Sequence, residues 1–148
     1  MDMNVTFCGH AKISDQKSVQ SWLFEVTQAL IEQGATTFYL GGYGSFDALA
    51  AWVLRKQKET HPDIKLVLVR PYLNWNKDGS GYDYSVYPPL ESVSPHLAIP
   101  KRNQWMVDAS QVVVSYVLHN WGGAAATLRY ARQKKKIILS YVPGVTAP

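Results

Sequence analysis

Short apolar runs alternate along the chain with longer segments of helical period. Five runs are rich in β-branched and apolar side chains, which is typical of buried strands: 4–8, 36–40, 64–69, 111–117 and 137–141. These runs are apolar on both faces and helical segments separate them, which favours a mostly parallel sheet covered on both sides. The pattern predicts an α/β fold: a single Rossmann-like domain over residues 1–148, with a five-stranded sheet and helices on both faces.

The helical segments lie between these strands. In the first, apolar side chains from Val19 to Leu30 recur at the spacing of one buried stripe, and Gly34 follows the end of the helix. Further helices are predicted over 45–60, 101–109 and 124–133.

Residues 70–100 break this alternation. They contain five prolines, two glycines and five tyrosines or tryptophans, with no clear period. So long a segment without regular structure usually forms a functional loop or a lid. Its aromatic side chains can stack on a nucleobase. The alternative, which we expect for most of them, is that they pin the loop onto the domain.

Composition narrows the class of protein. Hydrophobic residues are 47% of the chain and charged residues 18%, as in ordinary globular proteins. No apolar run approaches the roughly 20 residues that span a membrane, and no signal peptide is visible. Cys8 is the single cysteine, which excludes an intramolecular disulfide and favours a reducing compartment. We therefore expect a cytoplasmic protein with no membrane partner.

Glycine turns supply the candidate site. Turns at 9–10, 41–45 and 122–123 each follow a predicted strand and precede a predicted helix, so they share one edge of the sheet. Glycine lets the backbone approach a ligand, and the amides at a helix start favour an anion such as phosphate. The alternative is that these glycines only permit close packing of helices, and it has more weight at Gly122 and Gly123 than at Gly41.

The net charge of +4 suits an anionic ligand, a nucleic acid or simply solubility, so the placement of the charges must decide. The run of lysines at 134–136 ends a helix on the edge opposite the glycine turns, where it complements the helix dipole. Arg70, Lys101 and Arg102 fall on the ligand edge and can pair with a phosphate or carboxylate. We therefore rank nucleic acid last among the partners.

No catalytic signature accompanies these turns. Cys8 ends an apolar strand and is expected in the core. His10 and His119 are not at zinc-ligand spacing, so we expect no metal. Asp47 and Glu91 can accept hydrogen bonds from ribose hydroxyls, although Asp47 is equally well placed to cap a helix.

The segments FCGH (7–10), LGGYGSFD (40–47), YPPLE (87–91), IPKRNQWMV (99–107) and WGGAA (121–125) occur in order along the chain. With them, the chain resembles the YspA-like, domain-of-unknown-function branch of the SLOG superfamily, named after the Smf/DprA and Lonely-guy proteins. The resemblance implies a Rossmann-like fold that binds a nucleotide-derived ligand, cyclic or of ADP-ribose type among others. Such domains resemble sensors in bacterial conflict systems, and a phage-borne relative would instead sequester the signal. Relatives often assemble, so we expect a homo-oligomer.

The enzymatic relatives, the Lonely-guy phosphoribohydrolases, carry Pro-Gly-Gly-x-Gly-Thr-x-x-Glu with a catalytic glutamate. That position is Ala48 here, and Asp47 points about 100° away on a helix. The branch also commonly has arginine where this chain has Ala11. We expect a binding protein, with a hydrolase that uses Asp47 or Glu91 as the alternative and single-stranded DNA binding as the third reading. With no cofactor other than a nucleotide-type ligand, the predicted ligand-binding residues are Gly9, His10, Gly41, Gly42, Tyr43, Gly44, Ser45, Asp47, Arg70, Tyr87, Glu91, Arg102, Asn103, His119, Trp121, Gly122 and Gly123.

Overall fold

A computed structural model describes residues 3–144, so the outermost ends of the predicted domain, 1–2 and 145–148, lie outside the described residues. The elements along the chain are β1 (Met3–Gly9), α1 (Gln16–Glu32), β2 (Ala35–Leu40), α2 (Ser45–Lys58), β3 (Lys65–Val69), β4 (Tyr84–Val86), the 3-10 helix η1 (Pro95–Leu97), α3 (Ala98–Asp108), β5 (Val112–Tyr116), α4 (Gly123–Gln133) and β6 (Ile137–Ser140). None of the helices within 3–144 has the length and apolar character needed to cross a bilayer.

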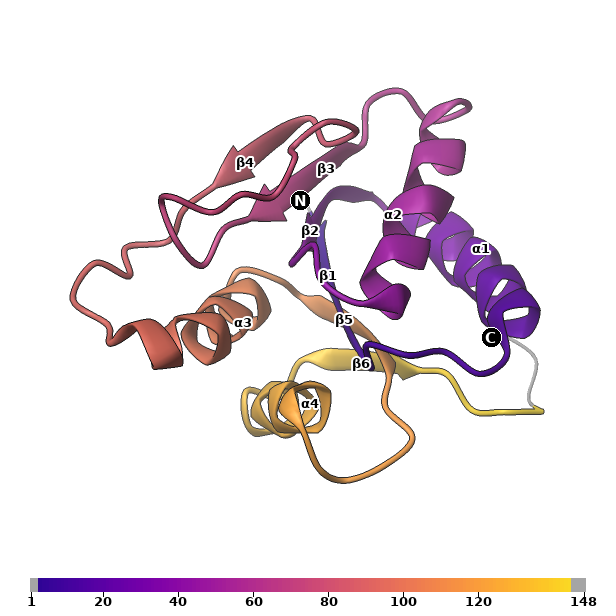
Figure 1. The fold of residues 1–148 in the computed structure, drawn as a ribbon. Coiled ribbons are helices and arrows are strands. Elements are labelled where there is room, and N and C mark those ends of the chain that lie inside the picture. Colours follow the sequence, from indigo (N-terminus) through magenta and orange to yellow (C-terminus); the bar gives the residue numbers. More distant parts are fainter. Residues whose placement is uncertain (1–2, 145–148) are drawn as a thin grey trace.

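The strands form one sheet in the order β4-β3-β2-β1-β5-β6, and each paired strand runs parallel to its neighbour. Helices α1 and α2 cover one face, while α3 and α4 cover the other (Figure 1). The chain moves outward from β1 to β4 and then crosses back to β5, so the strand order reverses between β1 and β5. The predicted Rossmann-like α/β fold is confirmed.

The main core lies under α1 and α2. Val5, Phe38 and Val114 point into it from three neighbouring strands and are fully buried. Successive strand residues face opposite sides of a sheet, so Cys8 and Val113 face the smaller core beneath α3 and α4. Burial raises the pKa of the Cys8 thiol to about 12, which keeps it protonated and unreactive at neutral pH.

The segment 70–100 holds more regular structure than the sequence predicted. It contributes β4, a sixth strand at the edge of the sheet, and α3 begins at Ala98 rather than at Lys101. A strand of three residues is too short to show an alternating pattern. Pro100 is accommodated because the first turn of a helix needs no intrahelical N–H donor.

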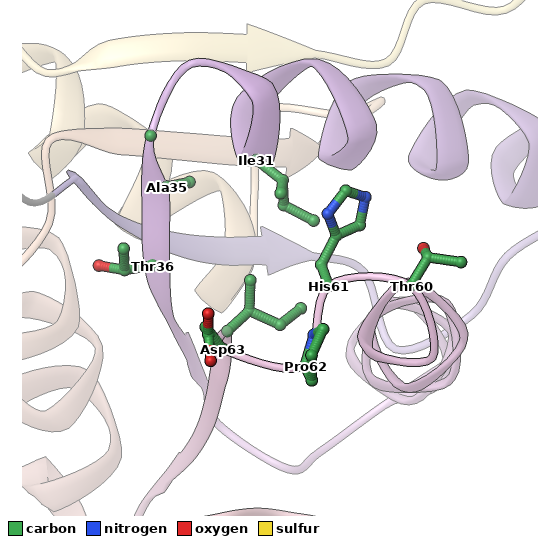
Figure 2. A pocket seen from close by; sticks show the side chains of 9 residues that line it. Ile31, Ala35, Thr36, Thr60, His61, Pro62 and Asp63 are labelled. Carbon is green, nitrogen blue, oxygen red and sulfur yellow. The ribbon is translucent and has the colours of Figure 1, made fainter.

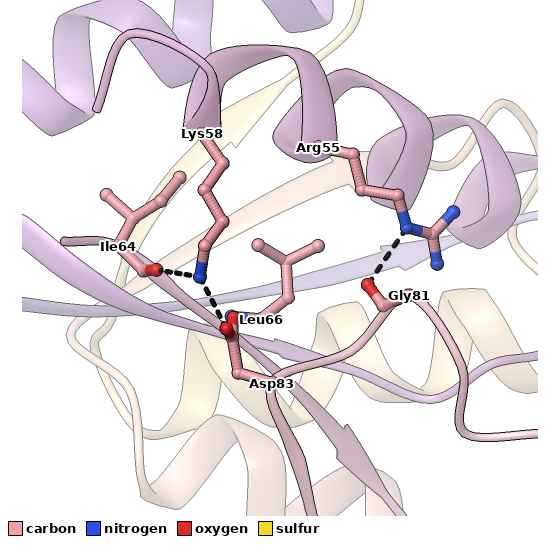
Figure 3. A network of polar contacts seen from close by, with 6 residues as sticks. All are labelled: Arg55, Lys58, Ile64, Leu66, Gly81 and Asp83. Carbon is pink, nitrogen blue, oxygen red and sulfur yellow. Dashed lines mark hydrogen bonds and ion pairs between the residues drawn. The ribbon is translucent and has the colours of Figure 1, made fainter. Parts of the chain in front are cut away.

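Asp83 attaches this segment to the rest of the domain. Its backbone N–H donates to the Leu66 carbonyl at 2.8 Å, and its carboxylate accepts the Leu66 N–H at 2.7 Å. The same carboxylate pairs with the Lys58 ammonium, which also donates to the Ile64 carbonyl at 2.8 Å (Figure 3). These contacts depend on residues distant in sequence, which explains why β4 was missed.

We predict that Asp83→Ala lowers the free energy of unfolding by about 1–3 kcal/mol, because it leaves the Leu66 N–H without its acceptor and the Lys58 ammonium without its opposite charge. Burial raises the pKa of Asp83, but the hydrogen bonds from Lys58 and Leu66 and the lysine charges outweigh it and hold that pKa below its usual range. The stabilisation is therefore complete above the ordinary aspartate pKa and is lost as the pH falls through the lowered value.

Chemical denaturation between pH 2 and pH 7 measures this loss. Asp63→Ala, at an exposed aspartate in the turn before β3, is the control. Equal stability of the two variants would show that Asp83 does not anchor β4.

Candidate functional site

The three glycine turns meet at the carboxyl edge of the sheet, where the strand order reverses. The Ser45 N–H donates to the Ala11 carbonyl at 2.8 Å, which joins the turns after β1 and β2. The His10 N–H donates to the Tyr116 carbonyl at 3.1 Å, and the His10 and His119 rings stack with centroids 3.8 Å apart, which joins the turns after β1 and β5. Such a reversal is where open α/β sheets bind ligands.

Helices α2 and α4 begin with the same backbone geometry. Gly44 precedes α2 at φ 89° and ψ 166°, and Gly122 precedes α4 at φ 90° and ψ 177°. This region of backbone space is essentially restricted to glycine. No side-chain hydrogen bond caps either helix start, so the first backbone amides of both helices face this edge.

The glycines differ in what surrounds them. A Cβ on Gly9 would lie 2.3 Å from the Phe46 ring, and one on Gly44 would lie 2.9 Å from Ala11 Cα, so both positions require glycine for packing. A Cβ on Gly123 would meet nothing within 4 Å. The packing alternative, which we weighted more heavily at Gly122 and Gly123, therefore fails there: the start of α4 is open.

Asp47 faces into the protein. Its carboxylate accepts the N–H groups of Gly42 and Tyr43 and is only 8% exposed, so it shapes the turn before α2. Both amides precede α2, so the Asp47 carboxylate holds the turn before the helix and does not cap the first amides of the helix itself. Burial raises the pKa of Asp47 to about 6, against the opposing effect of these amides and of Arg102 and Lys77.

Arg102 lies at the predicted edge of the sheet, but its side chain is buried there. The guanidinium donates from one nitrogen to the carbonyls of Gly41 at 3.0 Å and Val69 at 2.8 Å, and the side chain is 3% exposed. Its Nε donates to the side chain of Asn103 at 2.8 Å. Both residues were predicted to contact the ligand; in the structure Arg102 joins the carboxyl ends of β2 and β3, and Asn103 accepts a hydrogen bond from Arg102.

In the described part of the chain, the other predicted residues from the 70–100 segment make no hydrogen bond to the glycine turns. Arg70 donates to Ser85 Oγ at 3.1 Å and to the Trp75 carbonyl at 3.2 Å, so it holds the segment itself together. Within residues 3–144, no hydrogen bond or ring contact joins Tyr87 or Glu91 to the glycine turns.

Several aromatic residues of this segment have structural contacts. The Tyr72 hydroxyl donates to the Pro95 carbonyl at 2.9 Å. The guanidinium groups of Arg102 and Arg55 lie 6.0 Å and 5.2 Å from the rings of Trp75 and Tyr82. The expectation that most of these rings pin the loop is met for these three.

Sequence reasoning missed how the rings beside the site are arranged. His119 stacks between His10 and Trp121, with both centroid distances 3.8 Å and interplanar angles of 15° and 14°. His10 Nε2 accepts the Leu118 N–H at 2.8 Å, so the neutral ring carries its proton on Nδ1. Burial, followed by the nearby His119, lowers the pKa of His10. The sequence does carry a signal for this stack: His10 follows β1 and His119 follows β5, and these two strands are neighbours in the sheet.

A separate depression of about 300 Å³ lies at the opposite, amino edge of β2 and β3. Figure 2 shows Ile31, Ala35 and His61 among the side chains that line it. It is remote from the glycine turns and is not part of the candidate site. Across residues 3–144, no three His, Cys, Asp or Glu side chains gather closely enough to hold a metal ion.

No protein-family model and no curated protein matches this sequence. Several solved structures have the same fold, among them two DprA proteins and a molybdenum cofactor carrier protein. DNA processing protein A (DprA) from Streptococcus pneumoniae is 18% identical with a TM-score of 0.67, and the match covers 97% of this chain but 51% of that one. DprA from Helicobacter pylori, solved for its single-stranded DNA binding mode, is 15% identical with a TM-score of 0.60, covering 98% and 68%. The molybdenum cofactor carrier protein from Chlamydomonas reinhardtii is 14% identical with a TM-score of 0.59, covering 95% and 76%.

These likenesses define the class of protein by its fold. The chain has the α/β fold of DprA, so the fold that the sequence resemblance implied is confirmed. The YspA-like branch stays a prediction. Because one neighbour has a single-stranded DNA binding mode, our ranking of nucleic acid as the last partner is not supported.

We predict that Arg102→Ala lowers the free energy of unfolding by about 3–5 kcal/mol, because it strips the carbonyls of Gly41 and Val69 of their donor and leaves Asp47 without its buried counter-charge. Urea unfolding measures this cost. Arg132→Ala, at an exposed position in the last turn of α4, is the control. A loss below 1 kcal/mol would contradict the structural role of Arg102.

A second prediction concerns pH. The raised pKa of Asp47 means that its stabilising contribution is complete below the ordinary value of 3.8 and declines as the pH rises through about 6. The free energy of unfolding of the wild-type protein, relative to Asp47→Asn, should fall by about 3 kcal/mol across this window. A difference that does not change with pH would show that Asp47 ionises normally.

Proposed function

We propose that the protein binds a small, nucleotide-derived ligand bearing at least one phosphate, at the carboxyl edge of the sheet between the starts of α2 and α4. One observation carries this proposal: two helix starts with the same glycine geometry and no side-chain cap lie on either side of the strand reversal. Backbone amides and helix dipoles at such positions favour phosphate groups.

The charges near this edge support an anionic ligand. Lys12 and Lys77 are exposed beside the turns after β1 and β2, and a Cβ on Gly42 would lie 3.3 Å from Lys77 Cε. The nearest acidic group in the turn, Asp47, faces inward and is bonded to backbone amides. An incoming phosphate would therefore meet amides and ammonium groups first.

The chemistry of the site supports binding rather than turnover. The position of the Lonely-guy glutamate is Ala48, which is exposed on α2, and the Asp47 carboxylate points away from it into the protein. Glu91 lies outside the glycine turns, and the acceptor nitrogen of His10 is occupied by the Leu118 N–H. The ligand is thus held unchanged, as sensing or sequestering a nucleotide signal requires.

Single-stranded DNA is a second candidate, favoured by the likeness to DprA from Helicobacter pylori. It would use the same helix starts for its backbone phosphates. Its affinity should fall steeply with salt, because each phosphate contact releases counterions. A mononucleotide makes fewer such contacts and should show a shallower salt dependence.

The test is binding of AMP, ADP, ADP-ribose, a cyclic dinucleotide and a short oligonucleotide by isothermal titration calorimetry, in parallel with mass spectrometry of whatever the purified protein releases on denaturation. We predict that Gly123→Val weakens binding at least tenfold, because its side chain would occupy the space over the first amides of α4, where a Cβ meets no protein atom within 4 Å.

Ala126→Val, at an exposed position one turn further along α4, is the matched control. Gly42→Val is a poor choice, since Gly42 has φ 76° and a Cβ there would lie 2.7 Å from Leu68. If Gly123→Val binds these probes as tightly as the wild-type protein, the proposed site is wrong. If only the oligonucleotide binds, with a steep salt dependence, DNA replaces the small ligand.

A further inference from the structure

Trp121 presents a large ring to solvent at the start of α4. Its exposed fraction is 66%, although burying such a ring is strongly favourable. Tryptophan is enriched at the surfaces where proteins contact partners, because its large ring is apolar and its N–H is polar. The next residue, Gly122, precedes the open helix start described above.

The ring is held in place although it lies in a loop. His119 covers one face of the indole, and His10 covers the far face of His119, so three rings form a continuous column. The innermost ring, His10, lies edge-on to the buried Tyr116 with centroids 5.8 Å apart, and it accepts the Leu118 N–H. The column therefore runs from the core to the solvent.

The loop backbone is tied down as well. Arg129, on α4, donates to the Asn120 carbonyl at 3.0 Å, between the two outer rings of the column. A ring fixed in this way loses little conformational entropy when a ligand packs on it. The outer face of the Trp121 ring is thus held in position before a ligand binds.

We propose that the outer face of Trp121 is the platform on which a planar heterocyclic ring of the ligand stacks, while the phosphate lies at the neighbouring start of α4. This inference rests on the proposed function and deepens it: the ligand is a nucleoside phosphate whose base extends the column as a fourth ring. His119 acts as a positioning residue, because it holds the indole without facing the ligand.

Other aromatic side chains at this edge are less suited to the role. Trp75 lies beside the Arg102 guanidinium, and the Tyr72 hydroxyl is bonded to Pro95. Tyr43 is 76% exposed, but no stacked or edge-on ring contact supports it in the described part of the chain. Tyr43→Ala therefore serves as the comparison variant.

The experiment compares AMP, GMP, CMP, UMP and ADP-ribose with ribose 5-phosphate, which lacks the base, by calorimetry. The wild-type protein should bind the probes with a base more tightly than ribose 5-phosphate. Trp121→Ala should weaken those probes roughly ten- to a hundredfold and leave ribose 5-phosphate unchanged, because a base stacked on an aromatic ring contributes on that scale. Trp121→Phe should keep most of the affinity.

Two further variants test the column. His119→Ala should lose most of the tighter binding that probes with a base show over ribose 5-phosphate. His119→Phe should restore it, because only a flat ring is needed under the indole. Trp52→Ala, at a tryptophan on α2 that is 40% exposed, controls for the loss of a surface tryptophan. Melting temperatures of all variants confirm that they are folded.

The outcomes separate the two proposals. If Trp121→Ala keeps the advantage of the probes with a base, or if Tyr43→Ala loses it instead, the platform is refuted while Gly123→Val still tests the phosphate site. If the wild-type protein binds none of these probes, and neither ADP nor the cyclic dinucleotide, the proposed function fails and the platform fails with it.

Discussion

The carboxyl edge of the sheet depends on one buried charge, the guanidinium of Arg102. Burying a cation costs several kcal/mol unless hydrogen bonds and an opposite charge compensate it. Here the carbonyls of Gly41 and Val69, the Asn103 side chain and the nearby Asp47 do so. Because Gly41 and Val69 end neighbouring strands and Arg102 belongs to α3, this group fastens a helix to two strands at the place where the glycine turn begins.

A second constraint acts on the other side of the strand reversal and is of a different kind. There the turn after β5 is fixed by stacked rings from His10 to Trp121 rather than by buried charge. Both devices hold backbone amides in place before any ligand arrives. A site prepared in this way spends less conformational entropy on binding. The edge is therefore rigid where it would hold phosphate, although it lies on loops.

The alternation of strands and helices, the parallel sheet and the shared edge of the glycine turns could be read from the sequence, because each rests on local periodicity. Strand β4 could not be predicted from the sequence, since its attachment depends on the contacts of Asp83 with Lys58 and Leu66, which are distant in sequence. Sequence also placed Arg102 at the right edge but not inside it. The packing role of Gly9 and the openness of Gly123 depend on which side chains arrive from other elements, and no local pattern encodes that.

The fold alone does not choose between a nucleotide and a DNA strand, because one scaffold serves many functions and the choice lies in the site. Both ligands would place phosphate at the same helix starts. A strand, however, needs a cationic groove that continues along its backbone. The lysines at 134–136 follow α4 at its far end, on the edge opposite the glycine turns. These three lysines therefore do not extend a groove from this edge, and the exposed Lys12 and Lys77 beside the turns are the cations that either ligand would meet.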